Sequence, residues 1–79
     1  MAKILNMKSY NNGIRYIIEF ELESPSIAKS FEASCLMAVR EIHFFTDLYS
    51  KGSFLYLDSP NEEKVNEIGK RLKRTIESK

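Results

Sequence analysis

The sequence predicts an α+β fold in which two helices pack on one face of a three-stranded or four-stranded antiparallel sheet. Residues 14–22 alternate between apolar and polar side chains, which is the pattern of a half-buried strand. Segments 25–39 and 60–78 place apolar residues three and four positions apart, as amphipathic helices do. Residues 41–58 hold two aromatic-rich runs around a Ser-Lys-Gly-Ser turn, which is typical of a hairpin. The predicted order is therefore β-α-β-β-α.

The predicted strand 14–22 directs five apolar side chains to one side: Ile14, Tyr16, Ile18, Phe20 and Leu22. The Ser24-Pro25 step ends it, because proline has no N–H for a strand ladder and suits the first turn of a helix, where a serine can cap the free amides. Before this strand, residues 3–8 are weakly extended and an Asn-Asn-Gly turn follows at 11–13. The N-terminal residues would therefore either add a fourth strand or form an arm outside the sheet.

Each predicted helix has one apolar stripe. In the first helix the stripe consists of Ile27, Phe31, Cys35 and Ala38, and in the second of Val65, Ile68, Leu72 and Ile76. Leu36 and Met37 lie beside the first stripe, so either that helix ends near them or another element covers them. Ser59-Pro60 with Glu62 predicts a capping box at the start of the second helix. Gly69 within that helix indicates a close approach to a neighbouring element.

The predicted hairpin is apolar on both of its faces. Two helices can cover only one face of the sheet, so the other would be an exposed apolar patch unless a partner buries it. The residues predicted to form this partner interface are Ile17, Phe45, Tyr49, Phe54 and Tyr56. The alternative is that these aromatic residues are simply good strand formers whose rings are partly exposed without a binding role.

Length and composition set limits on the class of protein. The chain has 79 residues, which predicts a single domain over 1–79 with a small core. Its 12 Lys plus Arg and 11 Asp plus Glu give a net charge of +1, which supplies no overall field for nucleic acid or anionic lipid. Its apolar runs are far shorter than the roughly 20 residues that span a bilayer, and it begins without a signal peptide. We therefore expect a cytoplasmic protein that does not bind a membrane.

Candidate catalytic and metal-binding residues are few. Cys35 is the single cysteine and lies on an apolar helical stripe, where a cysteine is usually a small buried apolar residue. His43 is the single histidine and would need companions to bind a metal. Alternate glutamates at 19, 21 and 23 are typical of a solvated strand face. We therefore predict that the protein is not an enzyme and has no catalytic residues, metal or cofactor.

A basic cluster lies near the end of the second predicted helix: Lys70, Arg71, Lys73 and Arg74. Acidic residues begin the same helix, so this sorting complements the helix dipole and is explained by it. The other interpretation is a surface for nucleic-acid phosphates, and the four residues are the candidates for RNA contact.

Residues 16–35, which read YIIEFELESPSIAKSFEASC, resemble the opening of the Pcc family, the small dimerisation subunits of the KEOPS complex. Residues 41–58 resemble the central hairpin of that family, and the segment from Glu63 onward resembles its long closing helix. One departure concerns the closing helix, where the family has an aromatic, Leu, Arg and Trp. Arg74 can be matched to the family arginine, but the sequence contains no tryptophan. This loss puts contact with the catalytic subunit in doubt and favours a divergent paralogue, similar to the second archaeal Pcc-type subunit.

KEOPS adds a threonylcarbamoyl group to the adenosine beside the tRNA anticodon, and its chemistry belongs to other subunits. The resemblance therefore implies a non-catalytic dimerisation or scaffold subunit, which would form a homodimer or a heterodimer with a related Pcc-type chain through its free sheet face or a sheet edge. It also implies that the catalytic threonylcarbamoyltransferase subunit is a candidate partner and that tRNA is contacted only indirectly or weakly. The alternatives are a small RNA- or DNA-binding module that uses the basic helix, and an unrelated interaction protein of the same architecture.

Overall fold

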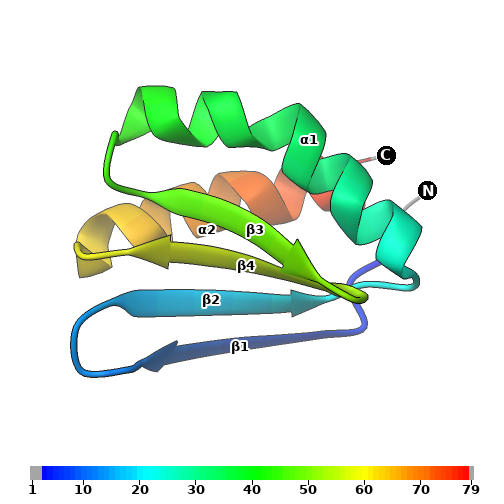
Figure 1. Ribbon diagram of the computed structural model, residues 1–79, viewed down its shortest axis with the longest axis horizontal. Helices are drawn as coiled ribbons and strands as arrows, with labels where there is room; N and C mark the ends of the chain where they lie inside the picture. The colour runs from blue at the N-terminus through cyan, green and yellow to red at the C-terminus, as the bar shows by residue number, and fades with distance from the viewer. Residues whose placement is uncertain (1–2, 79) are drawn as a thin grey trace.

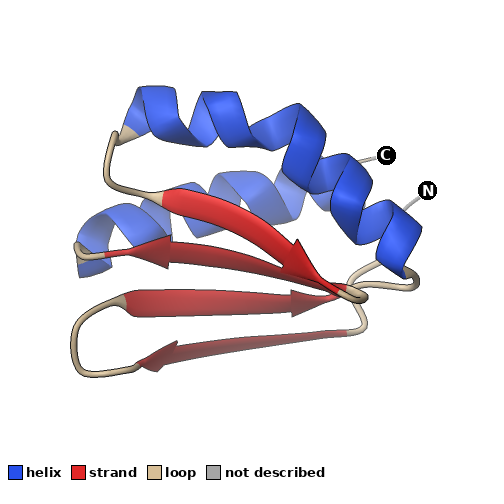
Figure 2. Cartoon of the chain, in the orientation of Figure 1, coloured by secondary structure: helices blue, strands red, loops and turns tan. Residues whose placement is uncertain are grey.

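The computed structural model describes residues 3–78, which form two layers (Figures 1 and 2). One layer is a sheet of four antiparallel strands in the order β1-β2-β4-β3. The other contains two helices, both on one face of the sheet. The elements along the chain are β1 (Asn6–Asn11), β2 (Tyr16–Glu21), α1 (Pro25–Ile42), β3 (Asp47–Lys51), β4 (Phe54–Ser59) and α2 (Glu62–Glu77).

The predicted α+β class with two helices is confirmed, and the N-terminal residues supply the fourth strand. β1 pairs with β2 along its whole length and stands at one edge of the sheet. Helix α1 lies against β3 and β4, and α2 lies against β4 and β2. Within residues 3–78, neither helix contacts β1. The helical layer is therefore displaced toward the β3 edge.

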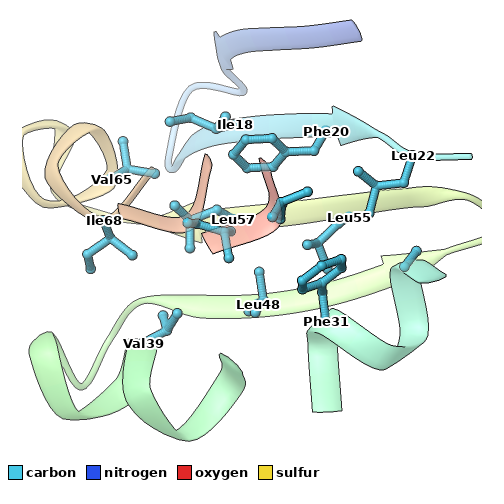
Figure 3. Packing of buried hydrophobic residues seen from close by; sticks show 13 residues of the cluster. Ile18, Phe20, Leu22, Phe31, Val39, Leu48, Leu55, Leu57, Val65 and Ile68 are labelled. Atoms are coloured by element: carbon cyan, nitrogen blue, oxygen red, sulfur yellow. The ribbon is translucent and has the colours of Figure 1, made fainter. Parts of the chain in front are cut away.

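The core lies between the helices and the sheet (Figure 3). Alternate residues of β2 and the residue after it point into this core, as the sequence pattern predicts: Ile18, Phe20 and Leu22 are all buried. Leu55 and Leu57 enter it from β4 and Leu48 enters it from the edge strand β3, and the helices contribute Phe31, Val39, Val65, Ile68, Leu72 and Ile76. Within the described residues, neither helix has the length and apolar composition needed to cross a bilayer.

The predicted inward position of Ile14 is wrong, because the chain turns there. The Asn12 Oδ1 atom accepts the backbone N–H groups of Ile14 and Arg15, at 3.1 and 2.8 Å. Gly13 has φ +98°, a conformation that suits glycine. These local bonds form the turn between β1 and β2, and the Ile14 side chain is 82% exposed. Strand β2 therefore begins two residues later, at Tyr16.

The prediction of a strand over residues 41–49 is also wrong in its first half. Helix α1 continues to Ile42, with Leu36 and Met37 inside it, and the His43 backbone N–H donates to the Val39 carbonyl at 3.1 Å. Phe44 and Phe45 lie in the connection between α1 and β3. The strand begins at Asp47, where pairing with β4 begins. No proline or glycine occurs between residues 26 and 42 to end the helix earlier.

The two helix starts differ from each other. Ser24 caps α1 as predicted, since its Oγ accepts the Ile27 N–H at 3.2 Å. The predicted Ser59 cap of α2 is wrong. Ser59 is instead a buried residue of β4, and Asn61 is the cap, with its Oδ1 accepting the Lys64 N–H at 3.0 Å. Because an asparagine caps as well as a serine, the helix begins just after the proline.

Candidate functional site

The candidate site is the face of the sheet opposite the helices, which we call the open face. Strand alternation and register decide which residues share it. Its members form three rows across β1, β2, β4 and β3: Tyr10, Ile17, Asp58 and Asp47; Lys8, Glu19, Tyr56 and Tyr49; Asn6, Glu21, Phe54 and Lys51.

Aromatic rings form a continuous strip over β4 and β3 on the open face. The rings of Tyr49 and Tyr56 lie 5.3 Å apart between centroids, with an interplanar angle of 22°. Phe54 stacks beside Tyr56 at 6.3 Å and 27°. Tyr10, on the edge strand, is 43% exposed. Ring pairs at these distances attract one another, so the strip forms an ordered surface.

Carboxylates lie among the tyrosines. Partial burial raises the pKa of Tyr56, and the negative charge of Glu19 raises it further. The same two causes raise the pKa of Tyr10. For Tyr49, burial and then the charge of Asp58 raise the pKa, and the Tyr49 hydroxyl donates to Asp58 Oδ2 at 3.4 Å. The open face therefore presents neutral phenol groups with carboxylates close to them.

Arg15 anchors the open face at the end where the β1–β2 turn lies. Its Nε atom donates to Asp58 Oδ1, and its Nη2 atom donates to the carbonyl oxygens of Phe45 and Asp58, at 2.9 and 3.2 Å. One side chain thus joins the turn, the α1–β3 connection and the end of β4. Because a guanidinium group offers donors in a fixed fork, it can hold all three acceptors at once.

The structure brings four of the five predicted interface residues together on the open face. Tyr49, Phe54 and Tyr56 are partly exposed there, whereas Ile17 is only 6% exposed and contributes little surface. Phe45 is not part of a strand and lines a hollow with Arg15 and Asp47. It is 65% exposed in the α1–β3 connection, beside Phe44.

Sequence reasoning missed Tyr10 as a member of the open face and treated Glu19 as part of a solvated face. Only the register shows that Lys8 stands opposite Glu19, and Tyr10 opposite Ile17. The alternation of Asn6, Lys8 and Tyr10, combined with the turn that follows, was the available signal.

The predicted basic cluster lies on α2, and all four of its side chains are exposed. Lys73 lines a hollow of about 420 Å³ between α2 and β1, whereas Arg71 and Arg74 line another of about 500 Å³ together with Glu63 and Glu67. Lys70 borders both hollows. The Arg71 guanidinium lies 3.9 Å from the Glu67 carboxylate. The cluster is therefore divided between two surfaces, and one of them also carries acidic residues.

Cys35 and His43 occupy structural positions. Cys35 is half-buried against the core, with its Sγ 3.8 Å from the Ser34 hydroxyl. The His43 Nδ1 atom lies 2.8 Å from the Thr46 hydroxyl, which donates to the buried Ser59 hydroxyl at 2.9 Å. Residues 3–78 contain no group of three or more metal-ligating side chains. His43 therefore helps to order the α1–β3 connection.

Comparison with family models, curated proteins and solved structures found no match to this chain. The fold and the open face define a small two-layer α+β protein with an uncovered aromatic sheet surface. The inference of function therefore depends on that surface and on the sequence resemblance.

Proposed function

We propose that the protein is a non-catalytic scaffold subunit that binds another protein chain through the open face of its sheet. The observation that carries this proposal is that Tyr10, Tyr49, Phe54 and Tyr56 share a sheet face that no element of residues 3–78 covers. Tyrosine and phenylalanine are enriched in protein interfaces, where they bury a large area at a small entropic cost. Phenol groups that stay neutral can donate hydrogen bonds to a partner's carbonyls.

The charges on the open face favour a protein partner over a nucleic acid. Nucleic-acid platforms combine stacked aromatics with positive charge along the phosphate path. Here Glu19 and Glu21 lie beside the aromatic strip together with Lys8 and Lys51, and Asp58 at one end of it is paired with Arg15, so positive charge does not run alone along the strip. Carboxylates in these positions repel phosphate groups, but they suit a partner that places lysine or arginine side chains around an apolar centre.

The specific form of the proposal is a Pcc-type subunit of the KEOPS complex. It is supported by the likeness of residues 16–35 to the family and by the succession β2, α1, β3, β4, α2, which is the order that the resemblance implies. Strand β1 is an addition to that order. In this role the protein would bind a related Pcc-type subunit in the cytoplasm of an archaeon and would support threonylcarbamoyladenosine formation on tRNA by the catalytic subunit. The missing tryptophan favours the divergent paralogue.

The test is to replace Tyr56 by lysine and to measure binding to a standard Pcc-type subunit from the same organism by calorimetry. Tyr56 stands opposite Glu19, so Tyr56→Lys gains a cross-strand ion pair and should fold. Loss of a central interface aromatic should weaken binding at least about tenfold. Phe44→Lys is the matched control, because Phe44 is exposed outside the open face. Equal affinities for the wild type and Tyr56→Lys would contradict the proposal.

A second candidate function is RNA binding by the hollow between α2 and β1. Lys70 and Lys73 border it, and neither forms an ion pair within residues 3–78. Lysines that contact phosphate give affinity that falls steeply with salt. Neutralising both lysines should lower both the affinity and the salt dependence if this site binds RNA, whereas neutralising Arg71 and Arg74 tests the other side of the helix. Affinity that responds to neither pair of changes nor to salt would remove this candidate.

A further inference from the structure

The two edge strands of the sheet differ in how their outward backbone groups are bonded. The Leu22 N–H donates to the Ser53 carbonyl at 2.8 Å, which continues the β2–β4 ladder. The backbone N–H and C=O groups of successive residues in an antiparallel strand point to opposite neighbouring strands. Even-numbered residues of β2 therefore bond to β4, and odd-numbered ones bond to β1. It follows that the backbone N–H and C=O groups of Leu48 and Ser50 on β3 point away from the sheet. Those of Met7, Ser9 and Asn11 on β1 do the same at the other edge.

The β3 edge is closed. The Leu48 N–H donates to Asp47 Oδ1 at 3.0 Å, and the Ser50 N–H donates to Glu32 Oε1 at 2.9 Å. Glu32 belongs to α1, which packs against β3. Both outward amides of this strand are thus taken by carboxylates, an arrangement that prevents another strand from pairing there.

The β1 edge is open. Its Met7 N–H donates to the neighbouring Asn6 Oδ1 at 3.0 Å, but within residues 3–78 the structure gives no acceptor to the N–H of Ser9 or Asn11. All six residues of β1 are exposed, and no proline interrupts it. An exposed strand with free outward N–H and C=O groups is a ready template for another strand.

We propose that β1 pairs antiparallel with β1 of a second copy of this chain, about a twofold axis at Ser9. Only outward residues can exchange hydrogen bonds, so Ser9 pairs with the partner's Ser9, and Met7 pairs with the partner's Asn11. In this register the free N–H groups of Ser9 and Asn11 find acceptors on the partner strand, and the Met7 N–H exchanges its local Asn6 Oδ1 acceptor for a carbonyl of that strand. The pairing joins two sheets into one continuous sheet of eight strands.

Charge favours this register over the one whose axis lies at Lys8. With the axis at Ser9, Lys8 stands opposite the partner's Tyr10 on the open face, where an ammonium group and a ring attract one another. Moving the axis to Lys8 would place two lysines directly opposite each other, which is unfavourable. The paired sheet also sets the two open faces side by side, so each remains available to the partner proposed above. The pairing does not depend on what that partner is.

A cysteine scan tests the register. In a Cys35→Ala background, which removes the only native thiol, single cysteines are placed at positions 7 to 11 and oxidised. Two residues on the axis have Cα atoms about 5.5 Å apart, within disulfide range. Ser9→Cys should form the covalent dimer, whereas Lys8→Cys and Tyr10→Cys should stay mostly monomeric on a non-reducing gel. A maximum at any other position, or no cross-link at all, would overturn the proposal.

Ser9→Pro supplies the second test. The Ser9 N–H points outward, so proline removes no bond within the sheet and the chain should keep its circular dichroism spectrum. Light scattering should give twice the chain mass for the wild type and a single chain mass for Ser9→Pro. A Ser9→Pro variant that keeps the doubled mass would contradict edge pairing. Tyr56→Lys should still cross-link through Ser9→Cys, so failure of the open-face proposal and failure of this one are distinguishable.

Discussion

Glu32 on α1 is joined twice to Ser50 on β3. Its Oε1 atom accepts the Ser50 backbone N–H at 2.9 Å and the Ser50 hydroxyl at 2.6 Å. One carboxylate therefore fixes a helix against a sheet edge and at the same time occupies a backbone donor that would otherwise be free.

Replacing Glu32 by alanine should lower the free energy of unfolding by about 1–2 kcal/mol, because two charge-assisted hydrogen bonds are lost at a partly buried site. Urea denaturation followed by circular dichroism measures the change. Glu41→Ala is the control, since Glu41 is exposed on the same helix. The variant should also self-associate more strongly at high concentration, because the β3 edge is opened. A Glu32→Ala protein as stable as Glu41→Ala would show that the two hydrogen bonds to Glu32 contribute nothing to stability.

The contact between α2 and β2 at Gly69 predicts a coupled pair of substitutions. A Cβ atom at Gly69 would lie 2.5 Å from Ile18 Cδ1, which is buried. Gly69→Ala gains about 1 kcal/mol in helix propensity but forces Ile18 to move, at a cost of about 1–3 kcal/mol. Ile18→Val removes that Cδ1 atom. In a double-mutant cycle, the two changes together should therefore be less destabilising than the sum of the single changes by about 1 kcal/mol. Simple additivity would contradict this packing.

The tyrosines of the open face predict a loss of stability at alkaline pH. Burial and nearby carboxylates raise the pKa values of Tyr10, Tyr49 and Tyr56 above the usual value of 10.0. Above about pH 10, the phenols of the unfolded chain ionise while those of the folded chain keep their protons, so rising pH favours unfolding. The contribution of the protonated tyrosines to the free energy of unfolding is complete below pH 10 and is lost as the pH rises through the folded-state pKa values.

The phenolate absorbance of the folded protein should accordingly rise at a higher pH than that of the urea-unfolded chain. Glu19→Gln removes one cause of the shift and should bring the titrations of Tyr10 and Tyr56 closer to that of the unfolded chain. Identical titrations of the wild type and Glu19→Gln would show that the carboxylate does not act on these rings.

Replacing Arg15 should loosen one connection of the chain rather than destabilise the whole protein. Arg15→Lys keeps the charge but loses the forked geometry that reaches Asp58 and the Phe45 carbonyl. The α1–β3 connection should loosen, and hydrogen exchange at the Thr46 amide, which donates to the His43 carbonyl at 3.0 Å, should accelerate several-fold. Amides in β4 should be affected less. Unchanged exchange at Thr46 would contradict an anchoring role for Arg15.

The sequence predicted those elements whose pattern is local. The alternation at Ile18, Phe20 and Leu22 identified β2 and its core face, and the Ser24-Pro25 step identified the start of α1. Both follow from short-range sterics and hydrogen bonding. The aromatic and β-branched segment 42–46 was misassigned because its strand propensity is overridden by the continuing helix and by the His43–Thr46 bonds.

The open face could be predicted only in part. Tyr49, Phe54 and Tyr56 were identified from the hairpin alone, since alternation decides their side of the sheet. Tyr10 and Glu19 were not, because their places depend on which strand lies beside which and in what register. The contrast between the two edges depends on individual hydrogen bonds to the carboxylates of Asp47 on β3 and Glu32 on α1, which no sequence period encodes.

The central claim is that the open face binds a protein partner. It is tested most directly by the absolute mass from light scattering on a sizing column, for this chain alone and then mixed with a standard Pcc-type subunit from the same organism. We predict that a mixed complex replaces both separate species for the wild type and fails to form for Tyr56→Lys. Two species that keep their separate masses in the wild-type mixture would contradict binding to a Pcc-type subunit, and a mixed complex that forms equally well with Tyr56→Lys would contradict binding through the open face.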